Sequence, residues 1–214
     1  PCRLLIVSGC LPQRYGKILE EELPEVDLFI GTGSFQNLPK LLAKRTTKKT
    51  TKKSYLTHRA FLYDDQTPRI LSTPSFMAYL KIAEGCSKVC TFCTVPKIRG
   101  PYRSRTPRSV IEEAERLANQ GVRELILIAQ DTTAYGEDLR NGTNLQKLLK
   151  SLVKVEGLRW IRMLYAYPKA RYFTEGLLEV IAREEKICPY LDLPIQHIDD
   201  EILKRMGRRS RSRE

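Results

Sequence analysis

The chain has 214 residues, of which 42% are hydrophobic and 29% charged, and this composition indicates a folded protein of one or two domains and excludes a disordered chain. Its longest aliphatic runs, at 4–7 and 125–129, are far shorter than the ~18 apolar residues of a membrane span, so we expect no membrane contact. The net charge of +12 suggests a nucleic-acid partner. Most of it lies in two short segments, however, with six positive charges at 44–53 and a net four at 205–214, and we interpret these as solvated segments rather than a binding face.

The first 43 residues are typical of the later part of a small α/β domain. Short aliphatic stretches predict strands at 4–7 and 26–30, and the apolar spacing predicts helices at 15–23 and 38–44. The turn at Gly31-Thr32-Gly33 resembles part of a dinucleotide-binding loop, but it lacks the third glycine of that motif, so we predict only a tight turn there.

Residues 44–77 are predicted to connect two domains. The Thr/Lys run at 44–54 is of low complexity and cannot pack a core. The stretch from 55 to 77 contains Pro68 and Pro74 and has no helical periodicity, so we expect an extended connector.

From residue 78 onward, strands and helices alternate. Apolar runs predict strands at 78–83, 124–129, 160–165 and 191–193. Helices are predicted after each strand, at 107–120, 145–156, 174–184 and 200–207, with Thr106, Asn144 and Asp199 as N-caps of three of them. Four β-then-α units with continuous apolar strands indicate a parallel sheet, open or closed into a barrel, with helices outside it.

Parallel α/β sheets bind their ligands at the carboxyl ends of the strands. The loops that follow the predicted strands contain Gln130, Asp131, Arg105 and His197. We predict that these four side chains contact a cofactor or substrate. The alternative is loop capping for Gln130 and Asp131, a structural hydrogen bond for His197 and a solvated charge for Arg105.

Three cysteines dominate the first of these loops. Cys86, Cys90 and Cys93 have the spacing Cys-x3-Cys-x2-Cys, which can hold three irons of a [4Fe–4S] cluster and leave the fourth iron open for catalysis. A zinc site is the alternative, but structural zinc takes four ligands, and neither histidine of the chain lies in the loop. Because the spacing is not that of a disulfide framework, we predict a reducing compartment and, by default, the cytoplasm.

This motif after the first strand of an α/β array resembles the radical S-adenosylmethionine (SAM) superfamily, and within it the methylthiotransferase family. The closer resemblance rests on Ser8-Gly9-Cys10, Gln13–Gly16, Gly31–Gly33, Arg99-Gly100, Ser104-Arg105, Ala129–Thr133, Leu164–Pro168, Tyr190–His197 and Met206–Ser210. Asp131-Thr132-Thr133 is similar to the RimO type of this family, whereas the sister MiaB type typically has Asn-Val-Asn there.

The resemblance implies the domain organisation of a protein truncated at both ends. Residues 1–43 would be the end of an N-terminal α/β methylthiotransferase domain, 44–77 a basic insertion and connector, and 78–214 the first part of a (β/α) radical SAM barrel. Since the chain begins with Pro1 rather than Met and ends at Glu214, we expect a fragment that is not complete for catalysis.

The resemblance also implies the cofactors. Cys86, Cys90 and Cys93 would hold the cluster that binds SAM, and an electron from that cluster would cleave SAM to a 5′-deoxyadenosyl radical. Cys10 would be one of three ligands of a second [4Fe–4S] cluster in the complete protein, with the other two ligands upstream of Pro1.

The acceptor implied for the RimO type is the β-carbon of an aspartate in small-subunit ribosomal protein twelve. Expected partners are therefore that protein or the assembled ribosomal subunit, and an electron donor such as flavodoxin. A tRNA adenosine is the alternative acceptor, as in the MiaB type. A non-enzymatic metal-binding module associated with the ribosome is the alternative from another functional class.

Overall fold

Two parallel sheets contain most of the strands, and each belongs to its own unit of the chain. The structure, a computed structural model, describes residues 2–47, 53–57 and 59–213. Unit 1 contains Pro1–Phe61, Gly85–Ser87 and Cys93–Pro101, and unit 2 contains Leu62–Glu84, Lys88–Phe92 and Tyr102–Glu214. The two units therefore interleave along the chain. The predicted domain boundaries at residues 43 and 77 stay a prediction.

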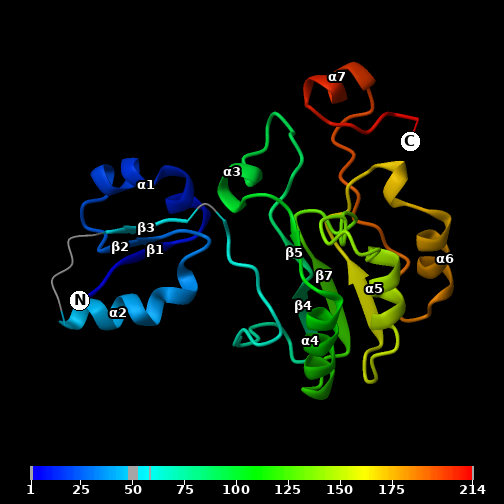
Figure 1. The fold of residues 1–214 in the computed structure, drawn as a ribbon, viewed down its shortest axis with the longest axis horizontal. Coiled ribbons are helices and arrows are strands. Elements are labelled where there is room, and N and C mark those ends of the chain that lie inside the picture. The colour runs from blue at the N-terminus through cyan, green and yellow to red at the C-terminus, as the bar shows by residue number, and fades with distance from the viewer. Residues whose placement is uncertain (1, 48–52, 58, 214) are drawn as a thin grey trace. The chain divides into compact units, whose positions relative to one another are not determined.

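Unit 1 is a three-stranded parallel sheet with a helix on each side. Its strands β1 (Ile6–Ser8), β2 (Leu28–Ile30) and β3 (Ser54–Tyr55) lie in that order. Figure 1 shows α1 (Cys10–Glu22) on one side of this sheet and α2 (Leu38–Thr47) on the other. Because both faces are covered, β2 is buried along its whole length. The short helices η1 (Phe35–Asn37) and α3 (Val95–Arg99) complete the unit.

The predicted connector contains a strand that the sequence analysis does not anticipate. Ser54 and Tyr55 pair in parallel with Phe29 and Ile30 of β2, whose outer edge would otherwise lack backbone partners. These two residues therefore belong to a sheet, and the connector at 44–77 stays a prediction. Residues 48–52 of the basic run, and His58, lie outside the described residues.

Unit 2 contains the second parallel sheet. Its strands are β4 (Met77–Lys81), β7 (Glu124–Ile128) and β8 (Trp160–Met163), with β7 in the middle. The strands β5 (Ala83–Glu84) and β6 (Arg103–Ser104) form a small antiparallel pair on either side of the cysteine segment. The predicted α/β class with parallel sheets is confirmed.

The helices of unit 2 follow its strands in chain order. Figure 1 shows α4 (Pro107–Asn119), α5 (Leu145–Leu152) and α6 (Glu175–Arg183) side by side along the sheet. The core lies between these helices and the strands, and it includes fully buried leucines of β7 and α5. Two shorter helices of unit 2 are η2 (Ala170–Tyr172), before α6, and α7 (Asp200–Arg205), after it.

The predicted N-caps are confirmed. The side chains of Thr106, Asn144 and Asp199 each accept a hydrogen bond from the backbone N–H three residues later, at 3.3, 2.9 and 3.0 Å. Such bonds satisfy N–H groups that the first turn of a helix leaves without a partner.

The fourth predicted strand, at 191–193, is not formed. The chain turns after β8 because Tyr165 adopts a left-handed conformation, with φ 62°. The backbone N–H groups of Tyr165 and Ala166 then both donate to Asp192, to its carboxylate at 2.7 Å and to its carbonyl at 3.0 Å. In a strand, the hydrogen bonds to a neighbouring strand would come from alternate residues rather than from one residue. Pro194 also has no backbone N–H with which to continue such a strand.

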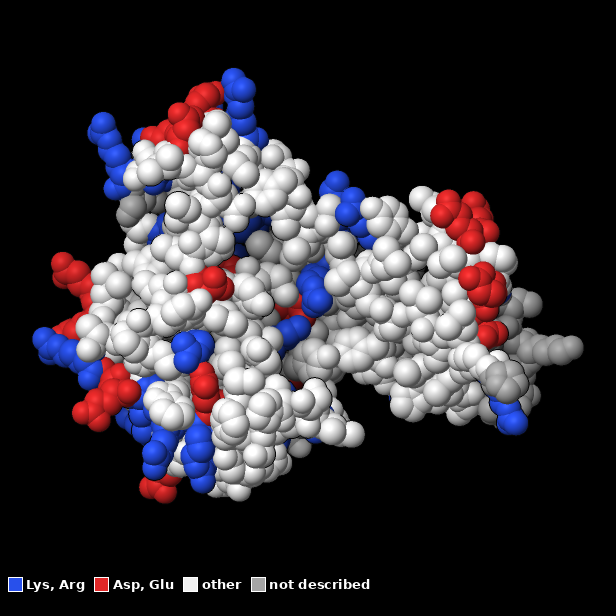
Figure 2. All heavy atoms as spheres, turned by 180° about the vertical axis from the view of Figure 1, so that it is seen from behind, with Lys and Arg blue, Asp and Glu red and all other residues white. Residues whose placement is uncertain are grey.

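The surface of unit 2 has charges of both signs. On the face drawn in Figure 2, acidic and basic side chains of the described residues are interspersed over this unit. In the ranges that the structure describes, no helix has an apolar stretch long enough to cross a membrane.

Candidate functional site

The three cysteines of the motif lie on the segment between β5 and α3. Cys86 is buried, and Cys90 and Cys93 are partly exposed. Cys86 and Cys93 belong to unit 1, and Cys90 belongs to unit 2. Within the described residues, no three Cys, His, Asp or Glu side chains converge as metal ligands do. The set of donors nevertheless fits an iron–sulfur cluster, because thiolates closely spaced along the chain are its usual ligands.

A left-handed glycine begins this segment. Gly85 has φ 81°, and a Cβ at this position would lie 2.2 Å from the Pro101 carbonyl oxygen and 2.6 Å from that of Gly100. Glycine is therefore required by both the backbone angle and the close approach. The backbone N–H of Cys86 donates to the Gly100 carbonyl at 3.1 Å, which fixes the first cysteine against the end of α3.

Lys88, between the first and second cysteines, extends into a polar and aromatic site of unit 2. Its Nζ lies 2.7 Å from the Tyr172 hydroxyl and 3.0 Å from Oδ2 of Asp131, and 4.3 and 4.6 Å from the ring centroids of Tyr167 and Tyr172. Burial disfavours the charged ammonium, but the Asp131 carboxylate and the Tyr172 hydroxyl favour it more strongly. The pKa of Lys88 therefore lies above its ordinary value.

Asp131 follows β7 and is 2% exposed. Its Oδ1 accepts hydrogen bonds from the Thr133 N–H at 3.0 Å, the Thr133 hydroxyl at 2.5 Å and the Ala134 N–H at 3.3 Å. Its carbonyl accepts a bond of 2.8 Å from Tyr102, whose pKa is raised by burial and by the Asp131 carboxylate. Asp131 thus caps its own loop and pairs with Lys88. Its predicted contact with a cofactor stays a prediction.

Arg105 is also 2% exposed. Its Nη1 lies 2.6 Å from Oε2 of Glu113 and donates to the Lys81 carbonyl at 2.9 Å, and its Nη2 donates to the carbonyl and hydroxyl of Ser109. These contacts tie β4 and the start of α4 together, which gives Arg105 a structural role. Its predicted cofactor contact stays a prediction.

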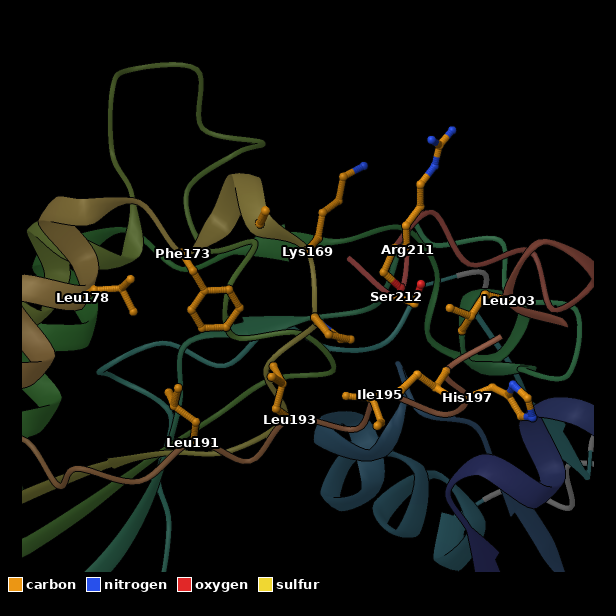
Figure 3. Close-up of a pocket in the computed structure, with 14 residues that line it drawn as sticks. Lys169, Phe173, Leu178, Leu191, Leu193, Ile195, His197, Leu203, Arg211 and Ser212 are labelled. Atoms are coloured by element: carbon orange, nitrogen blue, oxygen red, sulfur yellow. The ribbon is translucent and has the colours of Figure 1, made fainter. Parts of the chain in front are cut away.

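His197 borders an apolar cavity of about 470 Å³. Figure 3 shows Phe173, Leu193 and Ile195 among the side chains that line this cavity, with Lys169 and Arg211 at its rim. The Nδ1 of His197 accepts a hydrogen bond of 2.9 Å from the Asp199 N–H, at the start of α7. Gln130 is half-buried in the loop after β7. The predicted cofactor contacts of His197 and Gln130 stay predictions.

Cys10 is the first residue of α1, and its side chain is exposed. The Arg99 guanidinium, at the end of α3, donates to the Cys10 sulfur at 3.6 Å. Unit 1 therefore brings Cys10 next to the helix that follows Cys93. Its role as a ligand of a second cluster stays a prediction.

Sequence reasoning does not identify the site around Lys88. The residues that form it, Lys88, Asp131, Tyr167 and Tyr172, come from segments up to 84 positions apart, and no spacing in the sequence relates them. One signal is present in the sequence, namely a lysine between two cysteines of a metal-binding motif.

Comparisons with known proteins agree with one another. The sequence profile of the Radical SAM superfamily matches residues 80–214. The chain is 50% identical over 209 residues to the ribosomal protein uS12 methylthiotransferase RimO of Pelobacter propionicus, covering 98% of this chain and 46% of that protein. It is 53% identical over 213 residues to the protein of the same name from Syntrophus aciditrophicus, covering 99% and 47%. The chain thus spans about half the length of the curated relatives it matches.

Solved structures share the fold at low sequence identity. The radical SAM methyltransferase TsrM of Kitasatospora setae, solved with cobalamin and a [4Fe–4S] cluster, matches with a TM-score of 0.65 at 16% identity, covering 97% of this chain and 46% of that one. The cobalamin-dependent SAM radical enzyme OxsB, with aqua-cobalamin and SAM bound, matches with a TM-score of 0.64 at 13% identity, covering 98% and 33%. These matches confirm the predicted fold.

Proposed function

Since the chain belongs to the radical SAM superfamily, we propose that it is part of a methylthiotransferase that modifies small-subunit ribosomal protein uS12. The observation that carries this proposal is the identity of 50% over 98% of the chain with a RimO enzyme. The Asp-Thr-Thr sequence at 131–133 supports the same type. The finer proposal is that the acceptor is the β-carbon of an aspartate, modified in the cytoplasm on the free protein or on the ribosomal subunit.

We propose that Cys86, Cys90 and Cys93 hold a [4Fe–4S] cluster. When bound, such a cluster supplies the electron that cleaves SAM to the radical that attacks the acceptor C–H bond. The thiols of this chain would hold three irons and leave the fourth for SAM. Our candidates for contact with SAM or substrate are Gln130, Asp131, His197 and Arg105. In the complete protein Cys10 would help to hold a second cluster, and a flavodoxin-like protein would supply the electrons.

The cluster assignment can be tested on this chain alone. Anaerobic reconstitution with iron and sulfide should give one four-iron cluster on the wild-type chain and none on the Cys90→Ala variant, because two thiolates cannot anchor a cubane. The matched control is Cys188→Ala, which removes a buried cysteine outside the motif and should leave the iron content unchanged. A colourless protein that binds one zinc ion would contradict the assignment and favour a non-enzymatic metal-binding module.

The acceptor must be tested on the complete protein that contains this chain. With SAM, a sulfur source and a reductant, we expect the mass of one methylthio group to appear on the ribosomal protein and not on tRNA. The same protein with Cys90→Ala should modify neither. A methylthio group found on a tRNA adenosine instead would refute the ribosomal acceptor.

A further inference from the structure

The ammonium group of Lys88 is enclosed rather than solvated. Its side chain is only 23% exposed, although it begins on an irregular segment at the protein surface. A lysine is rarely buried unless a partner compensates for the lost hydration. Here the compensation comes from the Asp131 carboxylate at 3.0 Å, the Tyr172 hydroxyl at 2.7 Å and the faces of two tyrosine rings.

The groups that receive this ammonium are held in place independently of it. Three hydrogen bonds from Thr133 and Ala134 fix the Asp131 carboxylate through its Oδ1. The Tyr172 hydroxyl donates to Glu137 at 3.2 Å and accepts a bond of 2.9 Å from Arg171. The residues that contact the ammonium are therefore held in place at the sheet end of unit 2 before Lys88 binds to them.

A second contact holds the same segment on the other side of Cys90. The backbone N–H of Thr91 donates to the Met206 carbonyl at 2.9 Å, at the end of α7. Gly207, with φ 67°, follows at once, and a Cβ there would lie 2.6 Å from the Val89 carbonyl oxygen. Unit 2 therefore contacts the segment on both sides of Cys90, through the Lys88 side chain before it and the Thr91 backbone after it.

From this geometry we infer that Lys88 is a positioning residue for the proposed cluster. It fixes the segment that carries Cys90 by an ion pair with Asp131 and a hydrogen bond with Tyr172. The inference rests on the proposed function, because it presupposes that Cys90 binds iron. It assigns to Lys88, Asp131, Tyr167 and Tyr172 a role that the sequence motif does not specify.

Two consequences follow for a bound cluster. A segment that is already ordered loses less conformational entropy when it binds iron, so iron should leave more slowly. Lys88 also neutralises the Asp131 carboxylate, so removing it leaves a buried negative charge beside the Cys90 segment. That charge disfavours the additional electron of the reduced cluster, and the midpoint potential should therefore be lower without Lys88.

The experiment compares Lys88→Met with Arg162→Met on the reconstituted chain. Both variants remove a partly buried positive charge of unit 2 that pairs with a carboxylate and lies over a tyrosine ring, but Arg162 lies on β8, outside the cysteine motif. The measurements are the rate of iron loss to a chelator, the midpoint potential followed by electron paramagnetic resonance, and the melting temperature of the iron-free protein.

We expect Lys88→Met to lose iron roughly 10- to 100-fold faster, as changes around metal ligands typically do, and to have a more negative midpoint potential. Arg162→Met should leave the rate of iron loss and the midpoint potential unchanged, even if it lowers the melting temperature. If Lys88→Met does not fold, Asp131→Asn decides, because it removes the partner charge and keeps the shape, and it should speed iron loss in the same direction.

The outcomes separate this inference from the proposed function. A wild-type chain that binds no cluster would overturn both. A wild-type chain that binds a cluster, with equal iron loss and equal potentials in Lys88→Met and Arg162→Met, would overturn the role of Lys88 and leave the cluster assignment intact.

Discussion

The buried carboxylate of Glu113 offers the sharpest test of how unit 2 is stabilised. Glu113 lies on the inner face of α4, and its side chain is 4% exposed. Oε2 of this carboxylate lies 2.6 Å from Nη1 of Arg105, whose side chain is 1% exposed, and Oε1 lies 2.8 Å from Nη1 of Arg69. Replacing Glu113 with Gln keeps the shape and removes the negative charge.

The expected cost follows from the burial of Arg105. Removing one partner of a buried ion pair costs about 3–5 kcal/mol, because the other charge stays buried without compensation. Arg105 keeps its hydrogen bonds to the carbonyls of Lys81 and Ser109, so we expect a loss near 3 kcal/mol, at the lower end of this range. With a typical dependence of about 2 kcal/mol per molar urea, the unfolding midpoint should fall by about 1.5 M.

Urea unfolding followed by tryptophan fluorescence measures this loss, because Trp160, the single tryptophan, lies in β8 of the same unit. The matched control is Glu112→Gln on the same helix, whose partner Arg108 is 86% exposed. An exposed pair contributes little, so the midpoint of the control should hardly move. Equal midpoints for Glu112→Gln and Glu113→Gln would refute the argument that burial makes this pair important.

Three further predictions concern other residues. Burial raises the pKa of the Cys188 thiol, so in the native protein Cys188 should react with iodoacetamide more slowly than exposed Cys2. Equal rates of labelling of the two cysteines, measured by peptide mass spectrometry, would contradict this prediction. Gly207→Ala should lower the urea midpoint by more than Gly121→Ala, because both glycines have positive φ but only a Cβ at 207 would clash with a neighbouring atom. Equal losses of about 1–2 kcal/mol would mean that only the positive φ matters and that the clash does not. Hydrogen bonds from Gln66 and Ser109 lower the pKa of Asp65 to about 2, so its ionised form stabilises the fold above its ordinary pKa of 3.8, and this contribution is lost as the pH falls toward 2. An NMR titration that places the Asp65 carboxyl near 3.8 would disprove it.

The parts of the fold that sequence predicts are those whose signals are local. Thr106 and Pro107 mark the start of α4 because a capping side chain and a proline act on the first turn alone. The strand predicted at 191–193 fails for the opposite reason, since a strand needs a neighbour in register and Asp192 instead accepts two bonds from one turn.

The candidate site divides in the same way. The three-cysteine motif is recognisable because its ligands are eight residues apart or less. The predicted cofactor contact of Arg105 ignores Glu113, although this partner lies only eight positions away on the next helix. The enclosure of Lys88 depends on how two strand ends and η2 meet, and a single sequence contains no record of that arrangement.

The interleaving of the two units affects the order in which the chain can fold during translation. The Thr32 hydroxyl donates to the Ile98 carbonyl at 3.1 Å, and the Ala60 N–H donates to the Arg99 carbonyl at 3.2 Å. Both acceptors emerge from the ribosome after residues 62–84, which belong to the other unit. The first unit therefore cannot complete its hydrogen bonds until the cysteine segment has been synthesised. Maturation of its N-terminal sheet is thus coupled, in time, to the appearance of the residues proposed to bind iron.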